Sequence, residues 1–391
     1  MAGAVRRVGV AGRRARLTVR HRLCPTAWAA DSVAGATAVA ASLVALHATD
    51  AASVFLSVLA RTRDGRVGTV ERALYDDRAL IRMLGMRRTV WVLDRDVAPI
   101  VQAACARAVA ATQRKRLVAH LADSGVDEAA AWLADVEAAT HAALAARGEA
   151  AATELAADEP RLRTRIAATG QNATARVLLQ LAADGHIVRG RPRGSWTSTR
   201  YRWSPMTTWL GAPLAELAVE AAQIALAGHW LATFGPAPVS DLRWWAGWGI
   251  RETSRALAAL DTVEVDLEGT PGLMLAEDAD PVPAPEPAAA LLPALDPTPM
   301  GWQERSWFLG PHGPALFDRT GNIGPTVWWD GRIVGGWAQR PDGEVAVRLL
   351  DDIGADGEKA VQAGAERLAG HLGEVRVTPR FRTPLERELS T

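Results

Sequence analysis

The sequence has little of several features that would narrow its chemistry. Of its 391 residues only Cys24 and Cys105 are cysteines. Two cysteines cannot form a disulfide framework or a zinc site built of thiolates, and their scarcity is typical of a reducing cytoplasm. No stretch approaches ~20 consecutive apolar residues, and the N-terminus has no apolar segment. We therefore expect a cytoplasmic protein with no membrane partner and no secretory signal.

Short catalytic motifs are also missing. The chain has no zinc-protease pair of histidines, no Gly-Lys-Ser/Thr phosphate-binding loop and no nucleophile elbow. Its eight histidines are scattered without the spacing of metal ligands. These absences disfavour metal chemistry, nucleotide hydrolysis and serine hydrolase chemistry, and we expect no metal and no cofactor.

The charge sums to zero, with 44 basic and 44 acidic residues, but it is unevenly distributed. Only Lys115 and Lys359 are lysines, so the basic residues are almost all arginine, the better ligand for phosphates and base edges. Net charges of the five biased segments are +7 for residues 1–22, +7 for 78–116, +8 for 161–202, −8 for 123–160 and −8 for 261–290. Single charged segments are usually solvated faces, but three basic ones indicate a continuous positive surface and a polyanionic partner.

A unit of three helices followed by a β-hairpin recurs along the chain. It is clearest in the middle, where helices at 128–147, 153–157 and 171–183 precede short strands at 186–189 and 199–203. This order is typical of the winged helix, a helix-turn-helix variant. We predict an α+β fold with three tandem winged-helix motifs at 15–125, 126–212 and 213–278, a Pro-rich connector at 279–300 and a C-terminal β-rich section at 301–391.

Several individual elements are predicted around these motifs. Alternating β-branched residues indicate a strand at 87–93, and a long helix follows at about 95–120. Seven prolines make residues 279–299 an extended connection, and residues 374–381 read as a last strand.

The loop between the two middle strands is the strongest sign of nucleic-acid binding. Its sequence, RGRPRGSWTS, combines glycines for close approach, arginines for phosphates and a tryptophan that can wedge or stack. Surface hairpins also carry Gly, Pro and Arg for turn geometry alone. With residues of the helix before this loop and of the first motif, the predicted DNA-binding residues are Arg82, Arg87, Arg88, Asn172, Arg176, Arg189, Arg191, Arg193, Trp196 and Arg200.

A polar segment lies between the first two predicted helices. His47 and Thr49 are two residues apart, so in extended backbone they point the same way, and Asp50 can cap the next helix. We take His47, Thr49 and Asp50 as catalytic candidates. The simpler interpretation is that His47 is a structural residue and Asp50 only a cap.

Four stretches together resemble a bacterial family of winged-helix DNA-binding domain proteins that includes the AlkZ/YcaQ-type DNA glycosylases. They are LVALHATDAASVFLSVLAR (43–61), ALIRMLGMRRTVWVL (79–93), LLPALDPTPMGWQERSWFLG (291–310) and LFDRTGNIGPTVWWDGRIVGGWA (316–338), and the resemblance covers about 15 to 385. It implies a C-shaped single body with a basic concave DNA channel. It also implies excision of bulky alkylated purines from DNA. The family's catalytic signature is Gln-X-Gln or Gln-X-Asp, and the two matching positions in this chain hold His47 and Thr49.

Three functions remain open at this stage. The first is a monofunctional DNA glycosylase, a hydrolase acting on bulky or alkylated purines in damaged double-stranded DNA, in base excision repair or genotoxin resistance. The second is a non-catalytic DNA-binding protein, such as a regulator or a lesion-sequestering factor. The third is a protein-interaction scaffold without a DNA role. We expect a monomer in each case.

Overall fold

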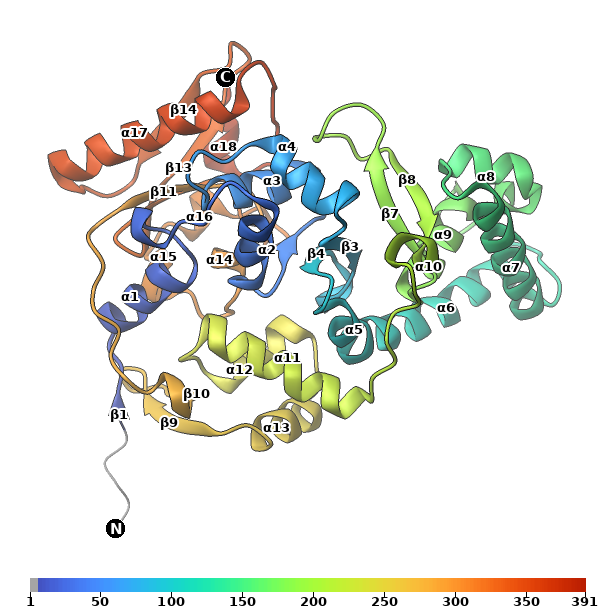
Figure 1. Cartoon of the computed structure of the whole chain (residues 1–391), viewed down its shortest axis with the longest axis horizontal. Helices are drawn as coiled ribbons and strands as arrows, with labels where there is room; N and C mark the ends of the chain where they lie inside the picture. Colours follow the sequence, from blue (N-terminus) through green and yellow to red (C-terminus); the bar gives the residue numbers. More distant parts are fainter. Residues whose placement is uncertain (1–5) are drawn as a thin grey trace. The chain divides into compact units, whose positions relative to one another are not determined.

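The computed structural model describes residues 6–391, which form two compact units. The first unit combines the chain up to Ala73 with Ile224–Thr391, and the second is Leu74–Gln223. Helices and strands alternate in both units, so the predicted α+β class is confirmed (Figure 1). The boundaries predicted for the winged-helix motifs stay predictions.

The first unit begins with a layer of helices. Its N-terminal elements are β1 (Arg6–Arg7), α1 (Val10–Arg20), α2 (Val33–Ala41), β2 (Leu46–His47), α3 (Ala51–Leu59) and α4 (Val67–Glu71). Every residue of α3 is buried, because the segment AASVFLSVL has no charged side chain to keep one face in water. Helix α2 ends at Ala41, before the polar segment of residues 47–50.

After α11 (Val219–Phe234), the first unit contains a helix pair and a hairpin. The elements are α12 (Val239–Ala246), α13 (Ile250–Ala258), β9 (Thr262–Asp266) and β10 (Pro271–Leu275). Strand β1 pairs in parallel with β9, which pairs antiparallel with β10. The inner face of this small sheet holds Val265 and Met274, which pack with Val8 in a separate hydrophobic cluster.

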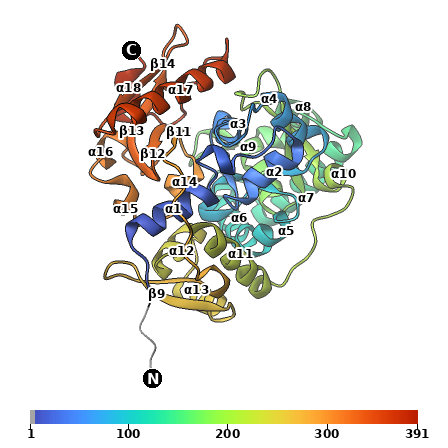
Figure 2. The same cartoon turned by 60° about the vertical axis from the view of Figure 1, so that its left-hand side comes forward.

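The C-terminal part of the first unit is a four-stranded antiparallel sheet in the order β11-β12-β13-β14. Its elements are β11 (Ala289–Leu292), α14 (Pro297–Met300), α15 (Ser306–Leu309), α16 (Gly313–Leu316), β12 (Thr326–Trp329), β13 (Arg332–Gln339), β14 (Val345–Leu349), α17 (Gly354–Leu372) and α18 (Pro384–Leu389). Helix α17 packs on β11 and β14, and α18 packs on β13 (Figure 2).

Two predictions for this region are wrong. The Pro-rich connector is shorter than expected, because Ala289–Leu292 pairs with β12 and α14 follows it. Residues 374–381 form no strand. The backbone N–H of Val377 instead donates to the side-chain oxygen of Gln339 at 2.8 Å, so a side chain replaces the strand ladder there.

The second unit packs its helices around one apolar core. Its elements are β3 (Leu80–Leu84), β4 (Val90–Asp94), α5 (Ala98–Val101), α6 (Arg107–Ala122), α7 (Ala129–Arg147), α8 (Ala152–Asp158), β5 (Arg165–Ile166), β6 (Gln171–Asn172), α9 (Ala173–Ala183), β7 (Ile187–Pro192), β8 (Tyr201–Pro205) and α10 (Met206–Leu210). Helical spacing puts Val177, Leu178 and Leu181 of α9 on the face that meets Leu133 and Val136 of α7.

The strand prediction at 87–93 was partly wrong. The structure has an antiparallel hairpin, in which β3 pairs with β4 and residues 86–88 form the turn. The long helix predicted after this strand is present, but a π-helical turn, Gln102–Ala106, lies between its parts α5 and α6.

Among the described residues no helix is long and apolar enough to cross a membrane.

Candidate functional site

The polar segment of residues 47–50 lies at the start of α3. Asp50 is extended, and one carboxylate oxygen accepts the backbone N–H of Ala52 at 3.1 Å, as an N-cap does. The other oxygen accepts the backbone N–H of Arg380 at 2.9 Å. Both carboxylate oxygens of Asp50 thus accept backbone N–H groups, and the side chain is nearly buried, since Asp50 is 9% exposed. The simpler interpretation of Asp50 as a helix cap describes these contacts.

His47 and Thr49 are the other two catalytic candidates of this segment. His47 ends β2 and is 5% exposed. Thr49 is half-buried, and its hydroxyl oxygen is buried with no hydrogen-bond partner among the described residues. A buried hydroxyl without a partner loses hydration free energy unless a water or ligand satisfies it. The Thr49 hydroxyl is therefore a natural position for a bound water.

A buried ion pair fixes α3 to the C-terminal part of the same unit. The Arg61 Nη2 donates to Asp296 Oδ1 at 2.7 Å and Nη1 donates to Asp296 Oδ2 at 2.8 Å. Ser57, one turn earlier, donates its hydroxyl to Asp296 Oδ2 at 2.7 Å. Neither charged side chain is exposed. This network anchors the end of the helix whose beginning carries Asp50.

His21 extends the same network. Its Nδ1 lies 2.9 Å from the Thr298 hydroxyl, which also accepts from Arg61 Nη2 at 2.8 Å. Burial, with the positive charge of Arg61, lowers the pKa of His21 to about 3. His21 is therefore neutral at physiological pH and has a structural role. Sequence reasoning missed these residues, although the stretch ALDPTP at 294–299, which contains Asp296 and Thr298, was part of the resemblance.

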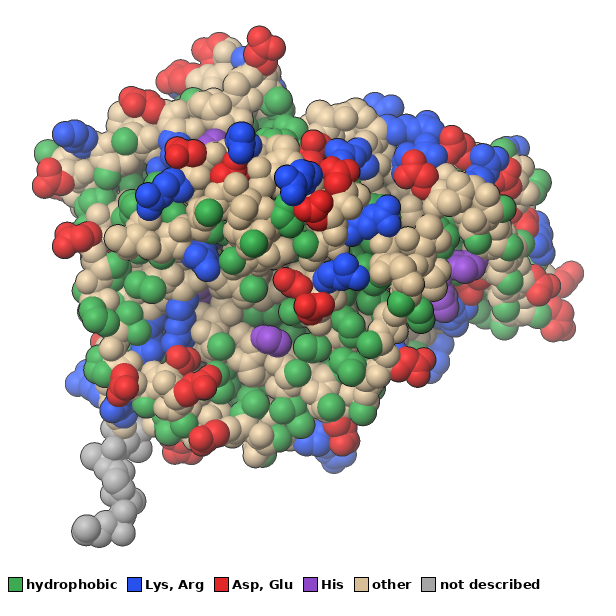
Figure 3. All heavy atoms as spheres, viewed as in Figure 1, with side chains coloured by type: hydrophobic (Ala, Val, Ile, Leu, Met, Phe, Trp, Pro, Cys, Tyr) green, Lys and Arg blue, Asp and Glu red, His purple; other side chains and the backbone are tan. Residues whose placement is uncertain are grey.

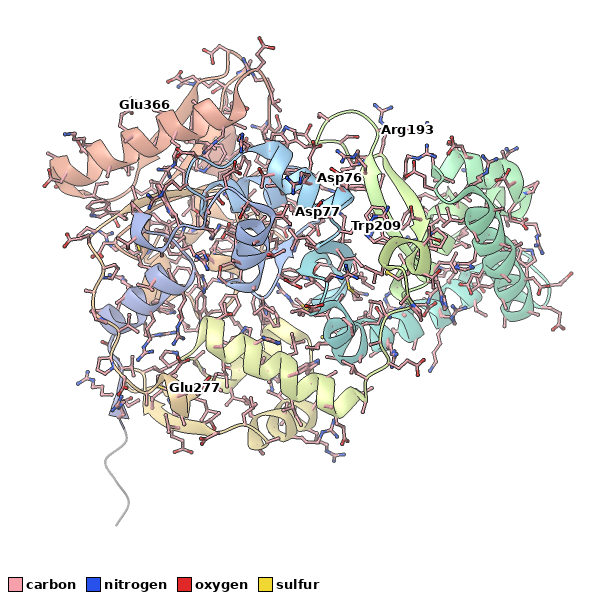
Figure 4. All side chains as sticks on the ribbon, in the orientation of Figure 1. Asp76, Asp77, Arg193, Trp209, Glu277 and Glu366 are labelled. Atoms are coloured by element: carbon pink, nitrogen blue, oxygen red, sulfur yellow. The ribbon has the colours of Figure 1, made fainter. Side chains whose placement is uncertain are left out.

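In the second unit, the hairpin of β7 and β8 presents the predicted basic loop. Arg193 lies on this loop (Figure 4) and pairs with Glu154 at 2.8 Å. Arg191 pairs with Asp76 at 2.8 Å and stacks over Tyr75 at 4.9 Å. Arg200 is exposed. The loop therefore carries less free positive charge than its sequence suggests.

Three predicted DNA-binding residues are packed within the second unit instead. Arg82 is 2% exposed and stacks 4.8 Å from the Tyr201 ring centre. Arg189 stacks 4.7 Å from the Trp203 ring centre, and burial lowers its pKa to about 10. Trp196 is 7% exposed.

The turn between β3 and β4 carries two consecutive arginines in the left-handed region. Arg87 has φ 50° and Arg88 has φ 62°. Left-handed backbone costs a non-glycine residue ~1–2 kcal/mol, and glycine or asparagine usually occupies such hairpin turns. Arg88 is exposed, whereas Arg87 is half-buried, which lowers its pKa to about 10.

The start of α9 holds the remaining two predicted residues. Asn172 is exposed at the N-cap position without making a side-chain cap bond. Arg176 lies one turn later and is half-buried.

The arginines of α1 do not form the basic surface that the charge distribution predicted. Arg14 donates to the Trp307 carbonyl at 2.6 Å, Arg16 donates to the Asp280 carbonyl, and Arg20 pairs with Asp278 at 2.6 Å. Arg13 is buried 4.1 Å from the Trp307 ring centre, and burial lowers its pKa to about 10. These guanidiniums satisfy carbonyls and cover aromatic surface. On the face drawn in Figure 3, basic and acidic side chains are interspersed.

The described residues hold no group of three or more His, Cys, Asp and Glu side chains arranged to bind a metal ion. The candidate functional residues are thus the segment 47–50 in the first unit and the arginine-containing turns in the second unit.

A family model and a solved structure match the chain. A family model described as "DNA glycosylase AlkZ-like" matches residues 40–371. The structure is similar to that of Streptomyces sahachiroi DNA glycosylase AlkZ, with a TM-score of 0.75 and 22% sequence identity over 96% of this chain and 99% of that chain. At this identity the structural likeness shows a shared fold. No curated protein sequence matches the chain significantly.

Proposed function

Because the chain belongs to the AlkZ-like DNA glycosylase family, we propose that it hydrolyses the N-glycosidic bond of bulky or alkylated purines in double-stranded DNA. The observation that carries the proposal is the family match over residues 40–371, which includes the whole segment His47–Asp50. We propose that the chain binds this DNA through three tandem winged-helix motifs.

The reaction needs an oriented water and stabilisation of a positively charged sugar. An N7-alkylated purine is already a cationic leaving group, so its departure needs little acid catalysis. In the proposed mechanism, His47 accepts a proton from the attacking water, and the unpartnered hydroxyl of Thr49 orients that water. Asp50 would contribute negative charge near the developing oxocarbenium ion, and two backbone N–H groups hold its carboxylate in a fixed position.

In the second unit, the proposed DNA contacts are the accessible members of the predicted set. Arg88, Asn172, Arg193 and Arg200 are exposed. Arg87, Arg176 and Arg191 are half-buried beside them and supply further positive charge. Arg82, Arg189 and Trp196 have a different proposed role, which is to hold the hairpin through packing. Exposed ion pairs such as Arg193–Glu154 are weak, so a DNA phosphate can compete for the arginine.

The test is a glycosylase assay on a duplex with one N7-alkylguanine, followed by cleavage of abasic sites. We expect base release by the wild-type protein and a loss of ~100-fold or more in His47→Ala, the range for general-base removal. The exposed His186→Ala is the matched control. No abasic product across a panel of bulky and small N7 and N3 adducts rejects the proposal, and full activity in His47→Ala rejects the assigned base.

A second candidate function is non-catalytic DNA binding, as a regulator or a lesion-sequestering factor. The observation that favours it is the departure from the Gln-X-Gln or Gln-X-Asp signature, whose positions hold His47 and Thr49 in this chain. Tight, salt-dependent binding to a lesion or an operator without base release in the same assay would support this alternative.

A further inference from the structure

The C-terminal segment passes beside the candidate reaction centre of the first unit. The backbone N–H of Arg380 donates to Asp50 Oδ2 at 2.9 Å, and its guanidinium Nη1 donates to the Thr49 carbonyl at 3.3 Å. Residues 377 and 379 line the narrow cavity behind Asp50. Arg380 therefore brings a positive charge to a segment that is far from it in the sequence.

The side chain of Arg380 differs from those of the two neighbouring arginines. Arg376 donates to the carbonyls of four residues, namely Pro341, Asp342, Gly373 and Val375. Arg382 makes a two-point ion pair with Glu386, at 2.7 and 2.9 Å. Arg380 is exposed and forms no ion pair with the described residues. Its guanidinium donates one long hydrogen bond to Thr49 and lies 5.7 Å from the Phe381 ring centre. Most of its five N–H donors are left for another partner.

We propose that the guanidinium of Arg380 binds the DNA phosphate next to the target nucleotide, while its backbone N–H positions Asp50. The inference rests on the proposed function, because it takes the 47–50 segment as the place where the target nucleotide lies. A phosphate flanks that nucleotide on each side, and a guanidinium is the side chain that best matches its oxygens. Residue 380 lies beyond the stretch that the family model matches, so family membership does not assign this role.

The two roles of Arg380 can be separated by substitution. Arg380→Ala removes the guanidinium and keeps the backbone N–H that Asp50 accepts. Arg380→Pro removes that N–H as well. Arg380→Lys keeps the charge without the planar two-point geometry. Arg319→Ala is a matched control, since Arg319 is an exposed arginine in the same unit.

The experiment measures binding of the full-length protein to a lesion duplex in which one phosphate at a time is a neutral methylphosphonate. We expect Arg380→Ala to bind the normal duplex about tenfold more weakly, as for loss of one charge-assisted hydrogen bond. One methylphosphonate beside the lesion should weaken wild-type binding by a similar factor and leave Arg380→Ala unaffected. Arg380→Lys should lose less, and Arg319→Ala should respond to the methylphosphonate as wild type does.

The proposal is overturned if Arg380→Ala binds as tightly as wild type, or if every methylphosphonate weakens both proteins equally. Base release is scored on the same duplexes. If Arg380 and one phosphate are coupled but no base is released, the proposed phosphate contact is supported and the proposed glycosylase activity is rejected. If a base is released without that coupling, the glycosylase activity is supported and the phosphate contact is rejected. Arg380→Pro should lower base release further than Arg380→Ala at saturating enzyme, and equal rates would reject the positioning role.

Discussion

Arg61 and Asp296 form a two-point ion pair in which neither side chain is exposed to solvent. A buried charge pair is weak evidence for stability in itself, but removing one partner leaves the other charge uncompensated. The pair joins α3 to α14, so its loss affects the helix that begins at Asp50.

We therefore expect Asp296→Ala to lower the free energy of unfolding by about 3–5 kcal/mol, because the Arg61 guanidinium would stay buried without a counter-charge. Urea denaturation followed by circular dichroism measures this. The exposed Asp356→Ala is the control and should change the free energy by less than about 0.5 kcal/mol. The double variant Arg61→Met/Asp296→Leu should recover part of the loss, and a single variant as stable as wild type would contradict the argument.

Arg88→Gly should make the protein more stable and weaken its DNA binding. Glycine relieves the left-handed backbone strain of the β3–β4 turn but loses more entropy on folding, which leaves a gain of about 0.5 kcal/mol. Thermal unfolding and binding to a duplex by fluorescence anisotropy measure the two effects. Arg88→Ala keeps the strain, so it should weaken binding without the stability gain. If Arg88→Gly and Arg88→Ala have the same melting temperature, the turn is not strained.

Glu154→Gln should tighten DNA binding by about two- to fivefold. The change removes the negative charge beside Arg193 and Arg202, while the amide oxygen can still accept the N–H of Ala151 at the start of α8. An exposed ion pair is weak, so the expected effect is small. Affinities at several salt concentrations give the measurement. The control is Asp158→Asn, which lies on the same helix as Glu154 and breaks the ion pair with Arg147 of α7. An equal gain in affinity there would indicate a general charge effect.

Stability should fall on acidification because of His21. Its pKa is lowered to about 3 in the folded protein, below the ~6.5 of an unfolded chain, so the unfolded state binds more protons between these values. The free energy of unfolding should therefore decrease by about 2–3 kcal/mol from pH 6.5 to 4.5 from this group alone. Urea midpoints across this range test it. His21→Gln should flatten the dependence, whereas the exposed His186→Gln should not. Identical slopes in wild type and His21→Gln would exclude His21.

Much of the secondary structure followed from local patterns. Helix α7 ends before Gly148, which has φ 73°, and α9 has an apolar face at helical spacing, so both were predicted closely. Strand β3 was missed because the segment LIRML reads equally well as part of a helix. Strand β11 was missed because the prolines around it suggested an extended connection.

The site was predictable only in part. The segment 47–50 was identified from its polar residues, and Asp50 as a cap from its place before α3. The hydrogen bond from the backbone N–H of Arg380 to the second carboxylate oxygen of Asp50 was not predictable, because the two residues are 330 positions apart in the sequence. The charge segments were misleading for a related reason, since a charged side chain does not show in the sequence whether it faces water or an aromatic ring. Arg13 on Trp307 and Arg82 on Tyr201 are examples.

The hydrogen bond between Arg380 and Asp50 has a consequence for synthesis of the protein. Ribosomes make the chain from the N-terminus, so His47 and Thr49 emerge long before the residue that fixes Asp50. Closing so large a loop is a late event in folding. The complete arrangement at residues 47–50 therefore forms only after residue 380 has been made, and a chain cleaved before that residue lacks it.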